Sequence, residues 1–158
     1  MVWDWIPRNA DRIGLLLVEH IRLALIPVLA GLLIAVPLGW LCNRDPRAKA
    51  FLVPAAGVLY TVPSLALFVV LPGILGTRIL SEINIVVALT IYTVALLVRT
   101  VADALAAVPG MVVAAATAMG YRPARRFFDV ELPLAVPVLI AGLRVATVSN
   151  ISLVSVGA

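Results

Sequence analysis

Charged and aromatic side chains gather in one polar stretch, residues 121–131, between two long apolar segments. It holds three arginines, two phenylalanines and two acids: Arg122, Arg125, Arg126, Phe127, Phe128, Asp129 and Glu131. Guanidinium groups bind carboxylates and carbonyls through strong hydrogen bonds, and aromatic rings are common apolar anchors of protein interfaces. The mixture favours docking to another protein, with a helix resting on lipid headgroups as the alternative. We expect the two acids to be solvated or to pair with the arginines.

The residues just before this stretch are typical of a helix that can seat in a groove. Small, strongly helix-forming alanines dominate it: Ala114, Ala115, Ala116 and Ala118. Gly120 can adopt the left-handed conformation that ends a helix, and Pro123 suits the first turn of the next one. The pattern predicts a helix over residues 114–119, a turn, and a second short helix.

Groups that could perform catalysis or bind metal are few. His20 is the only histidine and Cys42 the only cysteine, which argues against a metal centre and excludes an internal disulfide. The sequence has no GxxxxGK[ST] phosphate loop. We therefore expect no enzymatic activity, no bound cofactor and no metal, and we expect any ATP and magnesium to be bound by another subunit.

Composition places the chain in a membrane. Of its 158 residues, 63% are hydrophobic and 13% are charged, with a mean hydropathy of +1.14. A soluble domain is about half apolar and about a quarter charged, and a chain this short cannot hide so much apolar surface in a core. The net charge of +4 is dispersed and aromatic residues make up only 6%, so nucleic acid is not an expected partner.

Four apolar segments are long enough to cross a bilayer, because a helix needs ~20 apolar residues to span ~30 Å of hydrocarbon. They cover about residues 15–42, 51–75, 83–105 and 132–157. Residues 1–14 form an extracytoplasmic or interfacial segment, and residues 106–131 form a polar loop. The predicted fold class is all-α, a polytopic helical membrane protein with one transmembrane domain over residues 15–158.

Two spacings predict contacts of these helices. Gly31 and Ala35 form a small-xxx-small pair that lets another helix approach closely. Arg99 and Asp103 lie four residues apart on one helix face and are expected to form an ion pair.

Polar residues interrupt two of the segments. Tyr60, Thr61, Pro63 and Ser64 form a polar point with a proline inside the second segment. It either lines a wet path, where unwound backbone is tolerated, or is a kinked helix with locally satisfied hydroxyls. Arg144 follows Leu132 by 12 residues, roughly 18 Å along a helix. It either lines a path or fixes the bundle through a buried partner.

Basic residues set the expected orientation. The first and third connections lie on the same side and hold six of them: Arg44, Arg47, Lys49, Arg122, Arg125 and Arg126. The opposite side has only Arg8, Arg12 and Arg78. The positive-inside rule therefore puts residues 106–131 in the cytoplasm and the N-terminus outside.

The polar loop resembles the cytoplasmic loop of the membrane subunits of bacterial ATP-binding-cassette importers. That loop reads Glu-Ala-Ala, three residues, Gly, nine residues, an apolar residue, one more, and Leu-Pro. The positions that match are Ala115, Ala116, Gly120, Val130, Leu132 and Pro133, and Ala114 stands where the family has Glu. Segments 61–67, 131–134 and 141–148 are similar to osmoprotectant permeases for glycine betaine, choline, carnitine or proline betaine.

The resemblance implies a type I importer bundle in a bacterial cytoplasmic membrane, with partners that this chain does not contain. These are two ATPase subunits, a second permease subunit and an extracytoplasmic substrate-binding protein. It implies an ATPase-coupling set of Ala114, Ala115, Ala116, Gly120, Arg122, Arg125, Arg126, Phe127, Leu132 and Pro133. The candidate path set is Tyr60, Thr61, Pro63, Ser64 and Arg144. Family members have a further span after the fourth, so we expect the last span to be missing here.

Two other functions fit the same composition: a non-transporting membrane scaffold and a secondary carrier. Capture of a quaternary ammonium needs aromatic faces, and only Tyr60 and Tyr92 lie well inside the apolar segments. We therefore expect the delivery protein to determine most of the selectivity.

Overall fold

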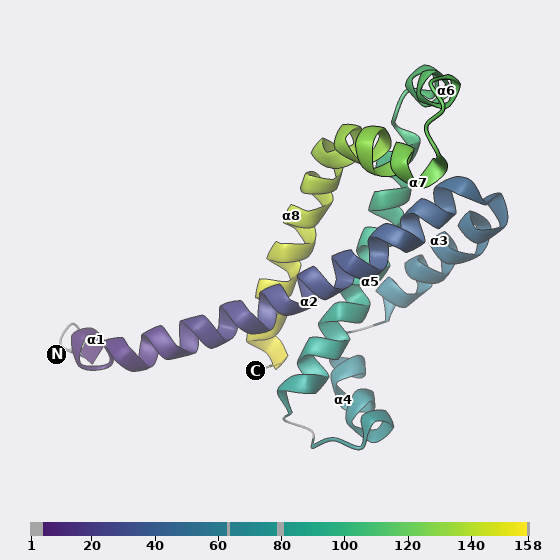
Figure 1. The fold of residues 1–158 in the computed structure, drawn as a ribbon. Helices are drawn as coiled ribbons and strands as arrows, with labels where there is room; N and C mark the ends of the chain where they lie inside the picture. The colour runs from purple at the N-terminus through teal and green to yellow at the C-terminus, as the bar shows by residue number, and fades with distance from the viewer. Residues whose placement is uncertain (1–4, 63, 79–80, 158) are drawn as a thin grey trace.

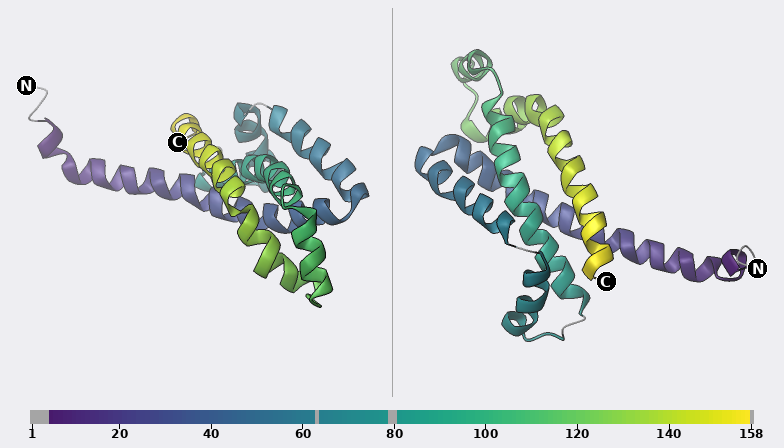
Figure 2. Two further views of the ribbon diagram at one scale, coloured as in Figure 1. Left: turned by 90° about the horizontal axis from the view of Figure 1, so that it is seen from above. Right: turned by 180° about the vertical axis from the view of Figure 1, so that it is seen from behind.

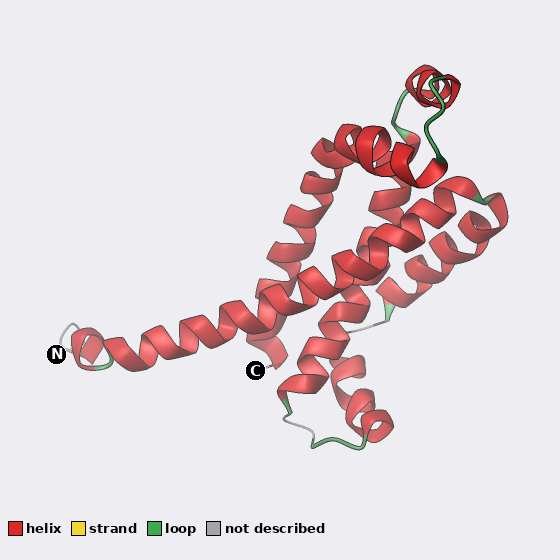
Figure 3. Cartoon of the chain, viewed as in Figure 1, coloured by secondary structure: helices red, strands yellow, loops and turns green. Residues whose placement is uncertain are grey.

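The computed structural model describes residues 5–62, 64–78 and 81–157, and these are helical with short connections (Figure 3). The helices are α1 (Trp5–Arg8), α2 (Ala10–Arg44), α3 (Pro46–Thr61), α4 (Ser64–Leu75), α5 (Glu82–Ala106), α6 (Gly110–Ala118), α7 (Pro123–Arg126), the π-helical turn η2 (Phe127–Glu131) and α8 (Leu132–Gly157). No strand occurs in the described ranges. The all-α prediction is confirmed.

Three helical stretches are long and apolar enough to cross a membrane: Ala10–Arg44, Glu82–Ala106 and Pro123–Val156. Helix α3 and the later part of α4, Ala66–Leu75, would add a fourth if this bent pair forms one span. The arrangement of four spans stays a prediction.

Helix α2 is longer than the first predicted segment because it begins at Ala10, within the stretch expected to be a separate interfacial segment. Its first turns, residues 10–19, are exposed and extend away from the other helices (Figures 1 and 2). The apolar side chains of residues 15–18 on this extension are exposed. They are suited to contact lipid or another polypeptide.

Small residues let α2 lie directly against α5. Gly31, Ala35 and Gly39 recur every four residues and are all buried. A Cβ atom added at Gly31 would overlap Thr93, and one added at Gly39 would overlap Val101. The close approach predicted from Gly31 and Ala35 is confirmed, and β-branched side chains of α5 fill the space that the glycines leave.

Helix α8 crosses both of these helices (Figure 1). Gly142 lies against Thr100 of α5, where a Cβ atom would overlap the threonine methyl group. Further along, the Asn150 amide donates a hydrogen bond of 2.9 Å to the Thr93 hydroxyl, and both side chains are buried. His20 of the α2 extension lies 3.1 Å from the carbonyl of Ile151. These contacts hold the stretch of α8 from Gly142 to Ile151 against α2 and α5.

The second apolar segment is broken where its polar point was predicted. Helix α3 ends at Thr61, Val62 is extended, and α4 begins at Ser64. The residue before a proline is disfavoured in the helical conformation, which accounts for the extended Val62. Pro63 itself lies outside the described residues. The two helices are bent by 107° relative to each other.

The polar loop contains two short helices in the predicted order, but the first, α6, begins at Gly110, before the predicted range of 114–119. Gly120 has φ of +83° and ends α6. The Gly120 N–H donates to the carbonyl of Thr117 and the Tyr121 N–H to that of Ala116, the hydrogen bonds of a Schellman motif. Pro123 occupies the first turn of α7. The loop does not end before α8, however, because α7, η2 and α8 form one continuous helical rod from Pro123.

Candidate functional site

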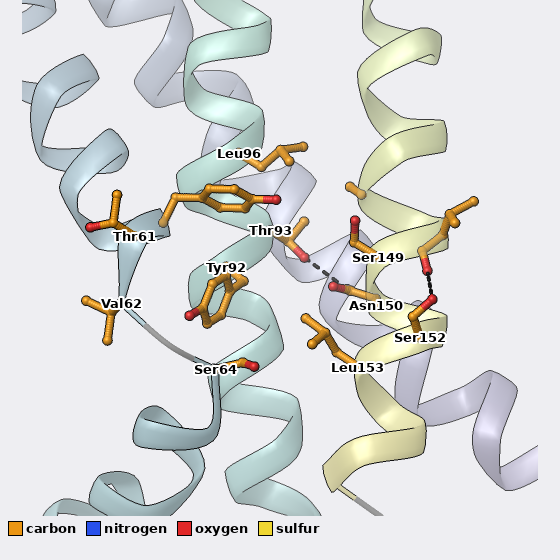
Figure 4. Close-up of a pocket in the computed structure, with 13 residues that line it drawn as sticks. Thr61, Val62, Ser64, Tyr92, Thr93, Leu96, Ser149, Asn150, Ser152 and Leu153 are labelled. Atoms are coloured by element: carbon orange, nitrogen blue, oxygen red, sulfur yellow. Dashed lines mark hydrogen bonds between the residues drawn. The ribbon is translucent and has the colours of Figure 1, made fainter.

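A pocket of about 520 Å³ lies between the break in the second segment, the middle of α5 and the C-terminal half of α8 (Figure 4). The residues that line it are Tyr60, Thr61, Val62, Ser64, Tyr92, Thr93, Leu96, Ala146, Val148, Ser149, Asn150, Ser152 and Leu153. Three of the five candidate path residues, Tyr60, Thr61 and Ser64, are therefore brought together. Arg144 does not line this pocket.

Two tyrosines form an aromatic corner in the pocket. The rings of Tyr60 and Tyr92 are 5.8 Å apart, edge to face. Tyr60 is exposed, whereas Tyr92 is only 8% exposed, and the described residues offer its hydroxyl no hydrogen-bond partner. A buried hydroxyl without a partner costs about 1–3 kcal/mol. Because this oxygen has almost no accessible surface, a polar ligand could relieve that cost only if the pocket lining shifts. Aromatic faces attract cations.

Short polar side chains from α5 and α8 form the opposite wall (Figure 4). The Thr93 hydroxyl accepts from Asn150 and donates to the Leu89 carbonyl at 2.8 Å. The Ser152 hydroxyl donates to the Val148 carbonyl at 3.0 Å. These groups keep acceptor lone pairs for a ligand while their protons are held by the protein.

At the break, Thr61 is hydrogen-bonded within its own helix and also lines the pocket, and a wet path there stays a prediction. The Thr61 hydroxyl donates to the Val58 carbonyl at 2.6 Å, so it is satisfied locally. Thr61 nevertheless lines the pocket together with Val62 and Ser64. A satisfied hydroxyl and a pocket-lining position are thus compatible.

Sequence reasoning did not identify the α5 and α8 contributions to the wall. Thr93, Ser149, Asn150 and Ser152 were not singled out. Asn150 could have been, because a side-chain amide inside a membrane-length apolar segment is expensive and usually functional. Its partner Thr93 is 57 residues away in sequence and could not be identified from spacing.

Arg144 lies on another face of α8. It is exposed and lines a separate hollow of about 690 Å³ with Pro137, Ile140, Ala141, Leu143, Thr147 and Val148. Val148 borders both hollows. No described residue forms an ion pair with the exposed Arg144. Its role, as a path residue or as one that fixes the bundle through a buried pair or a carbonyl, stays a prediction. A charge near the middle of a span is expensive in lipid, which indicates that this face meets water or another polypeptide.

The expected coupling residues divide into an exposed group and a buried group. Ala114, Ala115, Gly120, Arg122, Arg125 and Pro133 are exposed, and Leu132 is half-buried. Gly120, Arg122 and Arg125 line a hollow of about 410 Å³ with Met119 and Tyr121. This part of the loop is open to a partner and carries two guanidinium groups.

Phe127, Ala116 and Arg126 instead face this chain. Phe127 is buried, and its ring lies 5.5 Å from that of Trp40. The expectation that Phe127 provides an exposed anchor is corrected: Phe128 is the exposed phenylalanine. Arg126 pairs with Glu131, and Arg125 pairs with Asp129, which confirms the interpretation of the two acids as arginine partners.

Known proteins share this fold and sequence pattern. The family model described as binding-protein-dependent transport system inner membrane component matches residues 31–158. The chain is 33% identical over 130 residues to the choline transport system permease protein of Bacillus subtilis (strain 168), covering 82% of this chain and 58% of that protein. It is 32% identical over 153 residues to the osmoprotectant import permease protein of Salmonella typhimurium (strain LT2), covering 95% and 71%.

A third relative is the ergothioneine transport permease/ergothioneine binding protein of Helicobacter pylori (strain G27), 35% identical over 127 residues, covering 80% of this chain and 22% of that protein. A solved structure of the MetNI methionine ABC transporter, in an inward-facing conformation, has a chain that superimposes with a TM-score of 0.73. It is 23% identical, with 85% of this chain and 67% of that chain covered, and shows the fold alone. The chain thus spans little more than half of the choline permease. Because the family model covers most of its length, this chain belongs to the family of inner-membrane components of binding-protein-dependent transport systems.

Proposed function

We propose that this chain is a permease subunit of an ATP-driven importer for compatible solutes of the glycine betaine, choline, carnitine and proline betaine class. Two permease subunits would form the path, two ATPase subunits would dock to the 106–131 loop, and an extracytoplasmic binding protein would deliver the solute. ATP and magnesium would be bound by the ATPase subunits. The loop would lie in the cytoplasm of a bacterium and the N-terminus outside.

The observation that carries this proposal is the single helical rod from Pro123 to Val156. One end of the rod holds Arg125 beside the exposed hollow of the loop. The other end contributes Ser149 and Asn150 to the wall of the membrane pocket. A continuous helical stretch that reaches both a docking surface and a pocket suits ATP-driven transport, because displacement at one end can change access at the other.

The pocket supports the solute class. The quaternary ammonium group of such solutes is a poorly hydrated cation that aromatic faces attract by about 0.5–2 kcal/mol per contact. The Tyr60–Tyr92 corner supplies these faces, and the wall of hydroxyls and an amide can accept or donate hydrogen bonds to the rest of the solute. The relatives named above transport choline, osmoprotectants and ergothioneine.

The test is reconstitution of the chain in proteoliposomes with an importer ATPase subunit and an extracytoplasmic binding protein from the same organism. We expect uptake of radiolabelled choline or glycine betaine that requires ATP and is blocked by vanadate. Uptake that is insensitive to vanadate and is abolished by a protonophore would identify a secondary carrier. Absence of uptake with normal membrane insertion would support a scaffold.

Replacing Tyr92 by Phe isolates the pocket from the rest of the mechanism. The change removes only the unpartnered hydroxyl, so the fold should be unchanged or more stable by about 1 kcal/mol. We expect uptake to fall several-fold while ATPase association stays normal. Wild-type uptake by this variant would show that solute does not meet the hydroxyl.

A further inference from the structure

Two arginine–carboxylate pairs lie side by side near the start of the rod, and they differ in environment. Arg125 and Asp129 are 3.0 Å apart with side chains 74% and 45% exposed. Arg126 and Glu131 are 2.6 Å apart with side chains only 18% and 5% exposed. Exposed pairs contribute little because water and salt screen them. The sheltered pair, Arg126 and Glu131, is therefore the pair able to hold the helical segments around it in a fixed position.

The π-helical turn explains why Arg126 and Glu131 can meet. They are five residues apart, and in an α-helix this separation places two side chains about 140° apart around the axis. In η2 the N–H of Leu132 donates to the carbonyl of Phe127, five residues back. Such a turn brings residues five apart onto the same side of the helix. Arg125 and Asp129, four apart, need no such distortion.

Arg126 also reaches the preceding helix. Its Nη1 donates to the Thr117 hydroxyl on α6 at 2.6 Å, and that hydroxyl donates to the Val113 carbonyl at 2.7 Å. The proton of Thr117 is thus used within α6 and its oxygen is free to accept from Arg126. A continuous chain of hydrogen bonds runs from the backbone of α6 through Arg126 to Glu131, the last residue before α8.

The other side of η2 is held by aromatic packing. The Phe127 ring packs against Trp40 of α2, and the Arg44 guanidinium lies 4.5 Å over the Trp40 ring. Phe127 belongs to the main core together with residues of α2, α5 and α8. The base of α8 is therefore tied to α6 on one side and seated on the core on the other.

We propose that Arg126 and Glu131, brought into register by η2, are positioning residues that transmit displacement of α6 into α8. This inference rests on the proposed function, because it assumes that an ATPase moves α6. The pair does not contact solute or nucleotide. It determines how much of the work of ATP hydrolysis reaches the pocket.

The test compares Glu131→Gln with Asp129→Asn in the reconstituted transporter. Both remove one carboxylate charge, but only the first breaks the sheltered pair. We expect Glu131→Gln to keep ATPase association and ATP hydrolysis within twofold and to lower solute transported per ATP at least tenfold. Asp129→Asn should leave this ratio within twofold of wild type. Equal ratios in all three proteins would overturn the inference.

Thr117 gives an independent arm, because it is exposed and its replacement does not open the core. Thr117→Val removes the acceptor for Arg126, whereas Thr117→Ser keeps it. We expect the valine variant to lower solute transported per ATP several-fold and the serine variant to match wild type. If Glu131→Gln fails to accumulate in the membrane, the comparison of the two Thr117 variants tests the inference in its place. Loss of ATPase association in the valine variant would show that these residues act in docking. It would overturn the inference that they transmit displacement from α6 to α8.

A distance measurement tests the mechanical link directly. Spin labels would be attached at the exposed positions Met111 on α6 and Leu134 on α8. Pulsed electron paramagnetic resonance would then give the distribution of distances between the two labels. With the pair intact, we expect the same narrow distribution with and without ATP, and with Glu131→Gln a broader one. A broad wild-type distribution would contradict the inference. Failure of the wild-type protein to show ATP-dependent uptake would count against the proposed function instead.

Discussion

The Asn150 amide on α8 donates a 2.9 Å hydrogen bond to the Thr93 hydroxyl on α5 at the edge of the membrane pocket. The same amide nitrogen lies 3.5 Å from the Ala24 carbonyl on α2. One side chain thus joins three helices, two of which, α5 and α8, border the pocket. In lipid, a polar group of this kind needs a partner inside the protein.

A double-mutant cycle on Asn150 and Thr93 should measure this contact. We expect Asn150→Leu and Thr93→Val each to destabilise the fold by about 1 kcal/mol, with a coupling energy of about 0.6 kcal/mol, the average for hydrogen bonds between membrane helices. The measurement is reversible unfolding in mixed micelles. A coupling energy of zero would mean that the bond does not persist in the membrane.

The α2–α5 seam gives a second prediction, with a control on the same chain. Gly31→Ala would place a Cβ atom into Thr93, so α2 and α5 must separate and lose packing over several turns. We expect a loss of about 1–3 kcal/mol of stability, by the same unfolding measurement.

Gly57→Ala is the matched control for this seam. Gly57 lies inside helix α3, and a Cβ atom there meets nothing within 4 Å. Alanine should leave stability unchanged or raise it by up to about 1 kcal/mol, because it favours the helix. Equal effects at the two glycines would contradict the close approach of α2 and α5.

Local chemistry explains which features could be predicted from sequence. The break at Ser64 and the turn at Gly120 depend on a proline, a glycine and their immediate neighbours, so they appear where the sequence indicates. The seam was recognisable from the spacing of Gly31 and Ala35. In each case the residues that cause the feature are within a few positions of one another in the sequence. Only the residue that Gly31 packs against, Thr93, is distant and could not be identified from spacing.

Features that depend on distant residues were missed. Phe127 was expected to be exposed because it lies in a charged loop, but Trp40 of α2 provides an apolar contact for it. The π-helical turn has no local signal either, because its extra residue is stabilised by that packing and by the Arg126–Glu131 pair. The predicted set of pocket residues is incomplete for the same reason, because Thr93 and Asn150 come from different segments of the sequence.

Arg144 provides a prediction about water in the path. It lies midway along α8, a helix of 26 residues and thus about 39 Å long. If its face meets water in the assembled transporter, Arg144→Cys should react with a membrane-impermeant thiol reagent. Leu33→Cys, from an exposed apolar position inside α2, should face lipid and stay unreactive. The native Cys42 is buried and gives little background.

The reactivity of Arg144→Cys should also change with nucleotide if the path opens and closes. We expect at least a threefold difference in labelling rate between the ATP-bound and nucleotide-free transporter. If Arg144→Cys is as unreactive as Leu33→Cys, this face does not meet water in the assembled transporter, and the predicted wet path is contradicted.

Gly120 provides the last prediction, on the docking surface. Its φ of +83° is strained for any residue with a Cβ atom, although the space around it is open. Gly120→Val should therefore cost about 1–2 kcal/mol from backbone strain alone and open the Schellman turn that ends α6. We expect ATPase co-purification and uptake to fall at least tenfold while the membrane helices stay folded. Gly110→Ala, at the start of α6 with open space and no positive φ, should behave as wild type. Normal ATPase association by Gly120→Val would show that the partner does not recognise this turn.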